Sequence, residues 1–471
     1  MPRKAWQQLA LVLGDAALSL LSSGVLYISI SRLSGPELLG TYALAFAWLT
    51  LFQGVSSFGI PVFLMREVGA YGRNAAPYVA HAMLLGLGSG FVALCLMLAA
   101  VRLLGYSTYV VQVISISSLA LIPAFLNTVC RSAFLALREM HLMFLVTVVE
   151  VAIVMSASIS LLLSGYGAVA LMITLVVAKI TSASIALTLL HRGASHVRWS
   201  FNLGLLTRTA KTVSVLGIGN MLGMLTMRIN IIMVSAWVDI VSVGHFAAAT
   251  KVMEMGLMVS NLFGNLLMSR IAYNFNTQGN RDPNYFAAWY EALFALLLPI
   301  SVGVWIFAWP ILETLFGAGF GNALWVVRIL MVYLVIESAD MIMSIILIAA
   351  HRQREDVSRL ASNPVTNIAL TLALLPTMGI MGAAIGRVGG VAASATLRHL
   401  LIARALTRVK WLRFVLKPAL ISIGVGSICY LLPDLGHPAW LLLLYIAVTT
   451  ALLTVSCSFS RSVIKDMMSF P

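Results

Sequence analysis

Charge is scarce in this chain. Asp, Glu, Lys and Arg together make up 10% of its 471 residues, while 61% of the residues are hydrophobic. Soluble domains carry about 25% charged residues, so this composition excludes a water-soluble fold. The apolar residues gather in many runs of roughly 20, the length that a helix needs to cross about 30 Å of hydrocarbon. The sequence therefore predicts an all-α integral membrane protein.

Cysteines and catalytic patterns are also scarce. The four cysteines, Cys95, Cys130, Cys429 and Cys457, all lie inside apolar runs, which favours small core residues over disulfides or a metal site. We find no phosphate-binding loop, no His/Cys set with metal-ligand spacing and no nucleophile constellation. The longest outer loop, 309–322, carries one acid, Glu313. We therefore expect no catalytic residues, no metal, no cofactor and no enzymatic activity; a membrane glycosyltransferase or polymerase is the distant alternative.

Long apolar runs separated by short connections define the predicted spans. We count 14 transmembrane helices, and the longest connection lies near 191–211. The predicted spans are 8–31, 39–65, 77–103, 108–137, 142–164, 167–190, 212–236, 241–270, 286–308, 323–350, 357–376, 380–403, 415–433 and 438–458.

Basic residues predict the orientation of these spans. With the N-terminus inside, 21 Lys and Arg residues lie at cytoplasmic ends of spans, and only Arg32 and Arg102 lie at outer ends. This bias follows the positive-inside rule and predicts that both termini are cytoplasmic. It also accounts for the net charge of +14 through topology and contact with anionic lipid. We therefore expect membrane lipid, and no nucleic acid, as a partner.

The chain resembles itself six spans apart. A shift of 204 residues lays Gly40 on Gly244 and Arg66 on Arg270. A shift near 213–215 lays FLALREMH (134–141) on LIAAHRQRE (347–355), and GYGAVAL (165–171) on GIMGAAIG (379–386). Chance likeness between apolar helices is the alternative, but the common order of the matches favours a true repeat.

A repeat of six spans has both copies entering from the same side of the membrane. Such parallel repeats place a substrate site between the two copies, near the middle of the bilayer. We therefore predict two parallel six-helix lobes around a central cavity, with two extra C-terminal helices. The predicted parts are an N-lobe at 1–191, a cytoplasmic linker at 192–211, a C-lobe at 212–404 and the appended helices at 405–471.

A turn interrupts the apolar pattern between the first two spans, in SRLSGPELLGTY (31–42). Gly35 permits backbone angles that other residues avoid, and Pro36 cannot continue a hydrogen-bonded helix. With its flanks, ISRLSGPELLGTYALAFAWLTLFQGVSSFGIPVFLMRE resembles the first hairpin of the O-antigen (Wzx-type) flippases, which are polysaccharide exporters of the multidrug/oligosaccharidyl-lipid/polysaccharide superfamily. The resemblance lies in Arg32, Gly35, Pro36, Glu37, Gly40, Tyr42, Gly59, Pro61, Arg66 and Glu67.

The resemblance implies a flippase that moves undecaprenyl-pyrophosphate-linked oligosaccharides across the bacterial cytoplasmic (inner) membrane by alternating access. A lipid II flippase and a multidrug or cation antiporter of the same superfamily are the alternatives. We expect a monomer whose candidate protein partners are a polysaccharide polymerase and a chain-length regulator. An ordinary turn and a gate are both open readings for the hairpin residues Gly35, Pro36, Gly40, Arg66 and Arg270.

Charges inside the spans are the candidate binding residues, because each costs about 2.5–3.5 kcal/mol at a helix centre unless it faces water or a partner. Arg228 and Lys251 lie about 17 Å from the turn between their spans, at one depth. An anionic pyrophosphate between them would relieve their repulsion, although Glu254 is placed to pair with Lys251. The full predicted binding set is Arg228, Lys251, Arg131, Lys179, Asn261 and Asn265.

Acids inside the spans are candidates for coupling transport to H⁺ or Na⁺. Glu337 and Asp340 are three residues apart, hence on one face of a helix, and Glu254 is the third candidate. Neutralisation of nearby arginines is the equal alternative for Glu337 and Asp340. A multidrug extruder would place unpaired acids in its cavity, whereas here bases outnumber acids within the spans.

Overall fold

The computed structural model describes residues 3–194, 203–277, 283–350, 352, 355–356, 361–405, 411–431, 444–449 and 451–453. All the regular secondary structure in these ranges is helical, so the expected all-α class is confirmed. The chain divides into two compact units, Met1–Gly244 and His245–Pro471.

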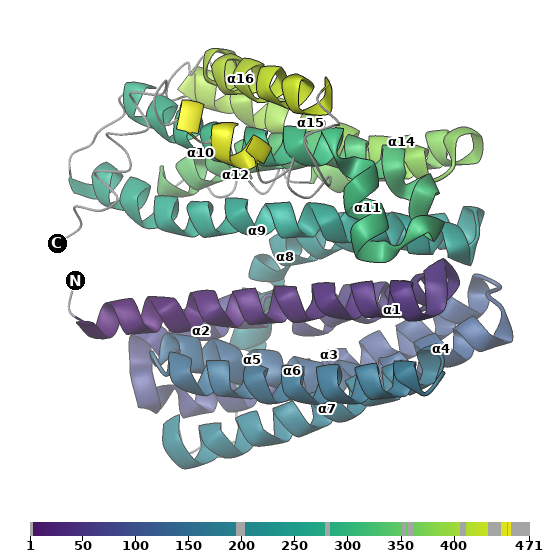
Figure 1. The fold of residues 1–471 in the computed structure, drawn as a ribbon. Coiled ribbons are helices and arrows are strands. Elements are labelled where there is room, and N and C mark those ends of the chain that lie inside the picture. The colour runs from purple at the N-terminus through teal and green to yellow at the C-terminus, as the bar shows by residue number, and fades with distance from the viewer. Residues whose placement is uncertain are drawn as a thin grey trace. The chain divides into compact units, whose positions relative to one another are not determined.

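The first unit contains eight α-helices and the start of a ninth (Figure 1). They are α1 (Arg3–Ser57), α2 (Ile60–Tyr71), α3 (Ala76–Leu103), α4 (Thr108–Ser118), α5 (Leu121–Ala136), α6 (Met140–Leu163), α7 (Ala168–Leu189) and α8 (Leu203–Trp237), followed by α9 (Ile240–Thr277), most of which belongs to the second unit.

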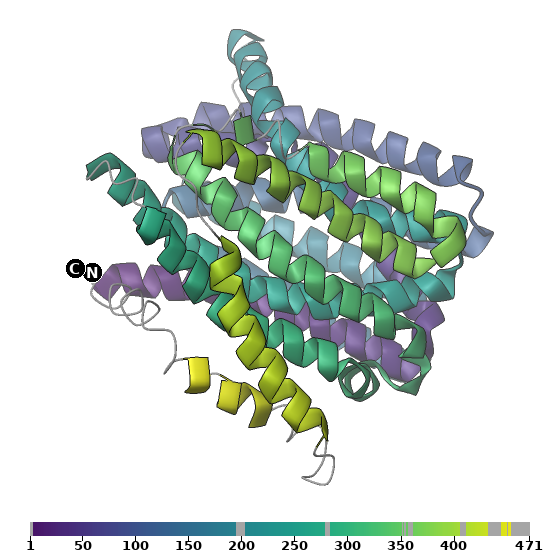
Figure 2. The same cartoon turned by 90° about the horizontal axis from the view of Figure 1, so that it is seen from above.

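The second unit continues with six longer α-helices, and residues 444–449 and 451–453 are also helical. The six longer helices are α10 (Pro283–Ile306), α11 (Ala308–Phe316), α12 (Leu324–Ala349), α14 (Ser362–Met378), α15 (Ile380–Ala405) and α16 (Trp411–Leu431). α14 and α15 lie side by side in both views (Figure 1, Figure 2), and α12 packs against α15.

Most helix bounds follow the predicted spans. The spans predicted at 77–103, 142–164 and 167–190 are α3, α6 and α7, with ends within two residues. The span predicted at 323–350 is α12. Apolar length therefore sets where these helices begin and end.

Two predicted spans contain an interruption of the helix. The span at 39–65 breaks at Gly59, whose φ of 73° starts the separate helix α2. A Cβ on Gly59 would overlap the Val213 carbonyl oxygen on α8, so the glycine allows the two backbones to touch. The span at 108–137 is interrupted between α4 and α5, after Ser118, but Thr108–Ala136 remains one apolar segment long enough to span the membrane.

The turn predicted at Gly35 is present. Gly35 has φ 77° and ψ −174° inside the residue range of α1, where the helix reverses (Figure 1). The rings of Tyr27 and Tyr42 are 5.8 Å apart, edge to face. Along a straight helix these residues would be about 22 Å apart. α1 is therefore a hairpin of two antiparallel halves.

Two glycines carry a reciprocal backbone crossing in the first unit. A Cβ on Gly40 would overlap the Ile240 carbonyl oxygen, and a Cβ on Gly244 would overlap the Pro36 carbonyl oxygen. Pro36 and Gly40 fall on Ile240 and Gly244 under the shift of 204 residues. Gly40 thus contacts Ile240, the equivalent of Pro36, while Gly244, the equivalent of Gly40, contacts Pro36 itself. Such a reciprocal pattern is the one found at a two-fold axis.

The repeat also appears in helix ends that lie in different units. Near the end of α5, the Glu139 amide donates to the Phe134 carbonyl at 2.8 Å; after α12, the Arg352 amide donates to the Leu347 carbonyl at 2.9 Å. Both pairs span five residues and are separated by the predicted shift. The matched turns at 165 and 379 likewise both have a glycine with positive φ.

Each unit has its own apolar core and an apolar exterior. One core packs α2, α3 and α5 around Phe125 and Phe134, and the other packs α10 and α12 around Phe294 and Ile342. Large apolar side chains such as Phe91, 62% exposed, cover the outside. In hydrocarbon such an exterior is favourable, and helices satisfy their own backbone hydrogen bonds. The chain is a multi-pass membrane protein.

The described residues hold nine helical segments that are long and apolar enough to span a membrane. The first of these, Ala10–Ser57, contains the hairpin turn and thus two predicted spans. The count of 14 and the lobe boundaries stay predictions. Residues 195–202 of the predicted linker, and all of the last predicted span except 444–449 and 451–453, lie outside the described residues.

Candidate functional site

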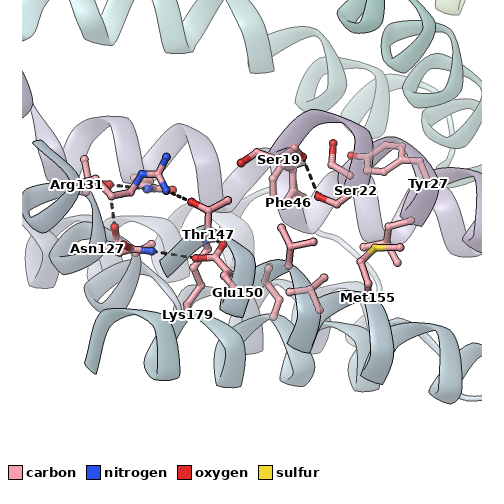
Figure 3. Close-up of a pocket in the computed structure, with 18 of the residues that line it drawn as sticks. Ser19, Ser22, Tyr27, Phe46, Asn127, Arg131, Thr147, Glu150, Met155 and Lys179 are labelled. Carbon is pink, nitrogen blue, oxygen red and sulfur yellow. Dashed lines mark hydrogen bonds and ion pairs between the residues drawn. The ribbon is translucent and has the colours of Figure 1, made fainter. Parts of the chain in front are cut away.

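A polar cavity of about 300 Å³ lies within the first unit (Figure 3). α1 supplies Ser19, Ser22 and Ser23, spaced so that they share one helix face. α5, α6 and α7 supply the charged and amide side chains. Charged groups gather at one end of the view, and hydroxyl and aromatic groups at the other.

One buried ion pair closes the charged end of this cavity. The Arg131 guanidinium donates to the Asp15 carboxylate at 2.5 Å and also to the Thr147 hydroxyl. Thr147 in turn donates to the other Asp15 oxygen at 2.5 Å. Asp15 is only 5% exposed. Its buried negative charge is balanced by the Arg131 guanidinium and by hydrogen bonds.

A second ion pair lies beside the first. The Lys179 ammonium is 2.5 Å from Glu150 Oε1. Asn127 and Ser182 donate to Glu150 Oε2 at 2.9 and 3.0 Å. Because the ionised carboxylate only accepts, the Asn127 amide nitrogen must face it. The Asn127 Oδ1 atom is then left with no hydrogen-bond partner among the described residues, in a side chain that lines the cavity.

Aromatic rings form the other wall of the cavity. Tyr42 and Phe46 stack with centroids 6.3 Å apart, and Tyr27 meets Tyr42 edge to face. The guanidinium of Arg228 lies 5.6 Å from the Phe46 centroid, a cation–π distance. α8 therefore brings the predicted binding residue Arg228 against the ring that lines this cavity.

The remaining predicted binding residues belong to the second unit. Lys251 is buried and its ammonium lies 2.7 Å from Glu254 Oε2. The pairing that the sequence allowed is thus present, and the shared depth of Lys251 and Arg228 stays a prediction. Asn261 is exposed on α9. The side chains of Asn265 and Arg270 lie outside the described part of the structure.

The predicted coupling acids on α12 face a buried arginine. Asp340 pairs with Arg398, which also donates to Asp356 at 2.7 Å. Ser394 donates to Asp340 at 2.8 Å. Glu337 lies one turn away on α12. For Asp340 this geometry favours neutralisation of an arginine, which was the alternative to ion coupling.

The second unit also holds an apolar cavity of about 400 Å³. Thr314 apart, its lining consists of aliphatic, glycine, methionine, proline and phenylalanine residues from α9, α10, α11 and α12. No charged side chain of the predicted site lines it. The two cavities therefore differ in chemistry, and the one in the first unit is the candidate site for a polar ligand.

The predicted hairpin residues are placed at the turn and at the other end of the hairpin. Gly35, Pro36 and Gly40 form the turn and the reciprocal crossing described above. Arg66 lies on α2 and pairs with the adjacent Glu67 at 2.7 Å. These placements describe a helix junction, and a gating role for them stays a prediction.

Asn127, Thr147 and the serines of α1 were not predicted as site residues. Spacing carried part of the signal: Asn127 and Arg131 are four apart, and Thr147 and Glu150 three apart, so each pair shares a helix face. Nothing in the sequence shows that the two faces meet. Their convergence depends on packing among α5, α6 and α7.

Comparison with known proteins identifies the family. The family described as "Polysaccharide biosynthesis protein" matches residues 11–271, more than half of the chain. The chain belongs to this family. The resemblance noted in the first hairpin is thereby confirmed. No sequence among curated proteins matches the chain.

Solved structures with the same fold are transporters of the expected superfamily. The lipid II flippase MurJ in an inward closed conformation matches with a TM-score of 0.77 at 13% identity, over 96% of this chain and 98% of MurJ. An inward-facing multidrug resistance MATE transporter matches with a TM-score of 0.68 at 18% identity, over 84% and 97%. A superfamily transporter from Pyrococcus furiosus, described as having a binding pocket of reverse polarity, gives 0.58 at 18%, over 84% and 94%.

Proposed function

We propose that this protein flips undecaprenyl-pyrophosphate-linked oligosaccharide repeat units across the bacterial inner membrane by alternating access. It acts as a transporter, without catalysis, and both termini face the cytoplasm. Membership of the polysaccharide biosynthesis family and the fold shared with MurJ and MATE transporters support this proposal.

The observation that carries the proposal is the polar cavity in a membrane-embedded helix bundle. Charged groups are expensive in hydrocarbon, yet Asp15, Arg131, Glu150 and Lys179 converge beside hydroxyl and aromatic groups. Such a cavity suits a hydrophilic sugar head group whose isoprenoid tail remains in the bilayer. A guanidinium such as that of Arg228 suits the pyrophosphate, through charge-assisted hydrogen bonds.

A clean deletion tests the function. Without the protein, lipid-linked repeat units should accumulate on the cytoplasmic leaflet and the surface polymer should disappear, as measured by mass spectrometry of lipid extracts and by gel analysis of the polymer. Plasmid-borne wild-type protein should restore both. Normal surface polymer in a strain without a second flippase would contradict the proposal.

The same strain separates the alternatives. A lipid II flippase would make peptidoglycan synthesis depend on the protein, as the fold shared with MurJ allows. A multidrug antiporter would change susceptibility to cationic dyes and leave the polymer intact. H⁺ or Na⁺ coupling is the expected energy source, and collapsing each gradient separately in proteoliposomes identifies the ion.

A further inference from the structure

The charged side chains in and beside the cavity of the first unit are already paired with one another. Asp15 and Arg131 form one pair, and Glu150 and Lys179 form the other. A phosphate at Arg131 or Lys179 would have to share that cation with a carboxylate that is mostly buried. Two anions on one cation repel each other, and the repulsion is strong where water is scarce. The cavity is therefore poorly suited to an anionic head group.

The remaining lining of the cavity has the features that sugars require. Ser19 and Ser22 present hydroxyl groups from α1, and Tyr27, Tyr42 and Phe46 present ring faces and edges. Hydroxyl groups exchange hydrogen bonds with sugar hydroxyls, and an aromatic face packs against the C–H face of a pyranose ring. The volume of about 300 Å³ equals the share of about ten waters in the liquid, on the order of one sugar ring.

One buried atom points to a hydrogen-bond donor as the ligand. Asn127 is 4% exposed and lines the cavity, and its Oδ1 has no partner among the residues described. Its amide nitrogen is committed to Glu150 and Ser182. A buried acceptor without a partner is costly, so a donor that reached it from the cavity would be favoured; a sugar hydroxyl is such a donor and a phosphate oxygen is not.

We propose that this cavity is a sugar subsite, which holds one uncharged ring of the lipid-linked oligosaccharide, and that the pyrophosphate is bound outside it. The inference rests on the proposed function, because it takes a glycosylated lipid as cargo. Arg228, whose guanidinium lies against the Phe46 ring, is the proposed contact for the pyrophosphate outside the cavity. The subsite thus recognises the sugar, and the pyrophosphate that all such lipids carry is bound at another place.

Filling the cavity tests the subsite. The Ser22 hydroxyl donates only within its own helix, to the Ser19 carbonyl at 3.1 Å, so Ser22→Leu adds bulk to the cavity without removing a contact between helices. Ser29→Leu is the matched control, since Ser29 donates to the Val25 carbonyl on the same helix and lies outside the cavity lining. Leucine has a high helix propensity, so neither substitution should disrupt α1.

The probes are bare undecaprenyl pyrophosphate and the lipid-linked oligosaccharide fraction extracted from the deletion strain, with binding measured by native mass spectrometry of the full-length protein. Wild type and Ser29→Leu should prefer the glycosylated lipid. Ser22→Leu should lower that preference at least tenfold. Phe46→Leu should lower it similarly and Phe46→Tyr should retain it, which keeps the test valid if Ser22→Leu misfolds.

The possible failures are distinguishable. If wild type binds neither lipid, the proposed function is overturned. Equal binding of the two lipids by wild type overturns sugar recognition. If Ser22→Leu and Phe46→Leu keep the wild-type preference, or weaken both lipids equally, the cavity is not a sugar subsite and the function proposal stands.

Discussion

At the scale of single residues, the charges within the spans are arranged mainly in pairs. Lys179 with Glu150, Arg131 with Asp15, Lys251 with Glu254 and Arg398 with Asp340 all form salt bridges. Pairing is the general answer to the cost of a charge in hydrocarbon. Because each of these four cations has an acid at its side, counting bases and acids within spans overestimates the positive charge that a cavity offers.

The pair of Lys179 and Glu150 allows a direct test of this coupling. Lys179→Met should lower the free energy of unfolding by about 3 kcal/mol, since it leaves the largely buried Glu150 without its counter-charge. The double variant Lys179→Met/Glu150→Gln should recover most of that loss, because the buried charge is gone and Asn127 and Ser182 can still bond the amide. Thermal unfolding in detergent, arranged as a double-mutant cycle, measures the difference.

Additive losses in that cycle would contradict the pairing. The single variant Glu150→Gln is the third corner of the cycle and should also be destabilising, because it leaves Lys179 without an anion. Arg66 and Glu67 provide a matched control, since they form an exposed pair at 2.7 Å in which Arg66 is 61% exposed. Removing that pair should cost less than about 1 kcal/mol.

At the scale of helices, close crossings depend on glycine. Gly40→Ala should lower the free energy of unfolding by about 1–3 kcal/mol, because its Cβ would overlap the Ile240 carbonyl oxygen and force the backbones apart. Gly69→Ala is the control: it lies within α2 with no atom within 4 Å of its Cβ. That change should be neutral or stabilising by up to about 1 kcal/mol. Fluorescence-detected size exclusion after heating compares them.

Equal stability of Gly40→Ala and wild type would show that the crossing is looser than described. Gly244→Ala supplies a second measurement, since its Cβ would overlap the Pro36 carbonyl oxygen from the other side. The two alanine variants should lose similar stability, because the contact is reciprocal.

Helix limits were largely predictable from the sequence, and helix breaks were not. The length of the apolar runs predicted α3, α6, α7 and α12. A helix that crosses the membrane must be apolar over the whole thickness of the hydrocarbon layer. The turn at Gly35 was predictable from Gly-Pro chemistry. The break at Gly59 was missed because it depends on the approach of α8, a tertiary contact that no local pattern reports.

The site was predictable only in its chemistry. Charges at Arg131 and Lys179 identified polar positions within apolar helices, but the sequence could not assign their partners, because Asp15 is 116 residues from Arg131. The internal repeat was the one sequence feature that indicated a contact between distant residues. Its shift of 204 residues aligned Gly40 with Gly244, and the structure brings these two residues together.

At the scale of the whole molecule, the distribution of basic residues predicts the orientation in the membrane. With the N-terminus inside, the turn between α6 and α7 faces the periplasm and the end of α2 faces the cytoplasm. Tyr166, 57% exposed, lies in the first of these places, and Ala70 is exposed in the second. Each position accepts a cysteine without disturbing a core.

In a variant whose four cysteines are replaced, Tyr166→Cys should react with a membrane-impermeant maleimide added to intact spheroplasts. Ala70→Cys should react only after the membrane is opened, and Asp239→Cys, between α8 and α9, should behave like Tyr166→Cys. The reason is that two predicted spans, 167–190 and 212–236, lie between Tyr166 and Asp239, so both positions should face the same side of the membrane. Labelling of Ala70→Cys in intact spheroplasts would show that the predicted topology is inverted. Opposite behaviour of Asp239→Cys and Tyr166→Cys would instead contradict the parallel repeat and leave the predicted orientation of the first lobe unchanged.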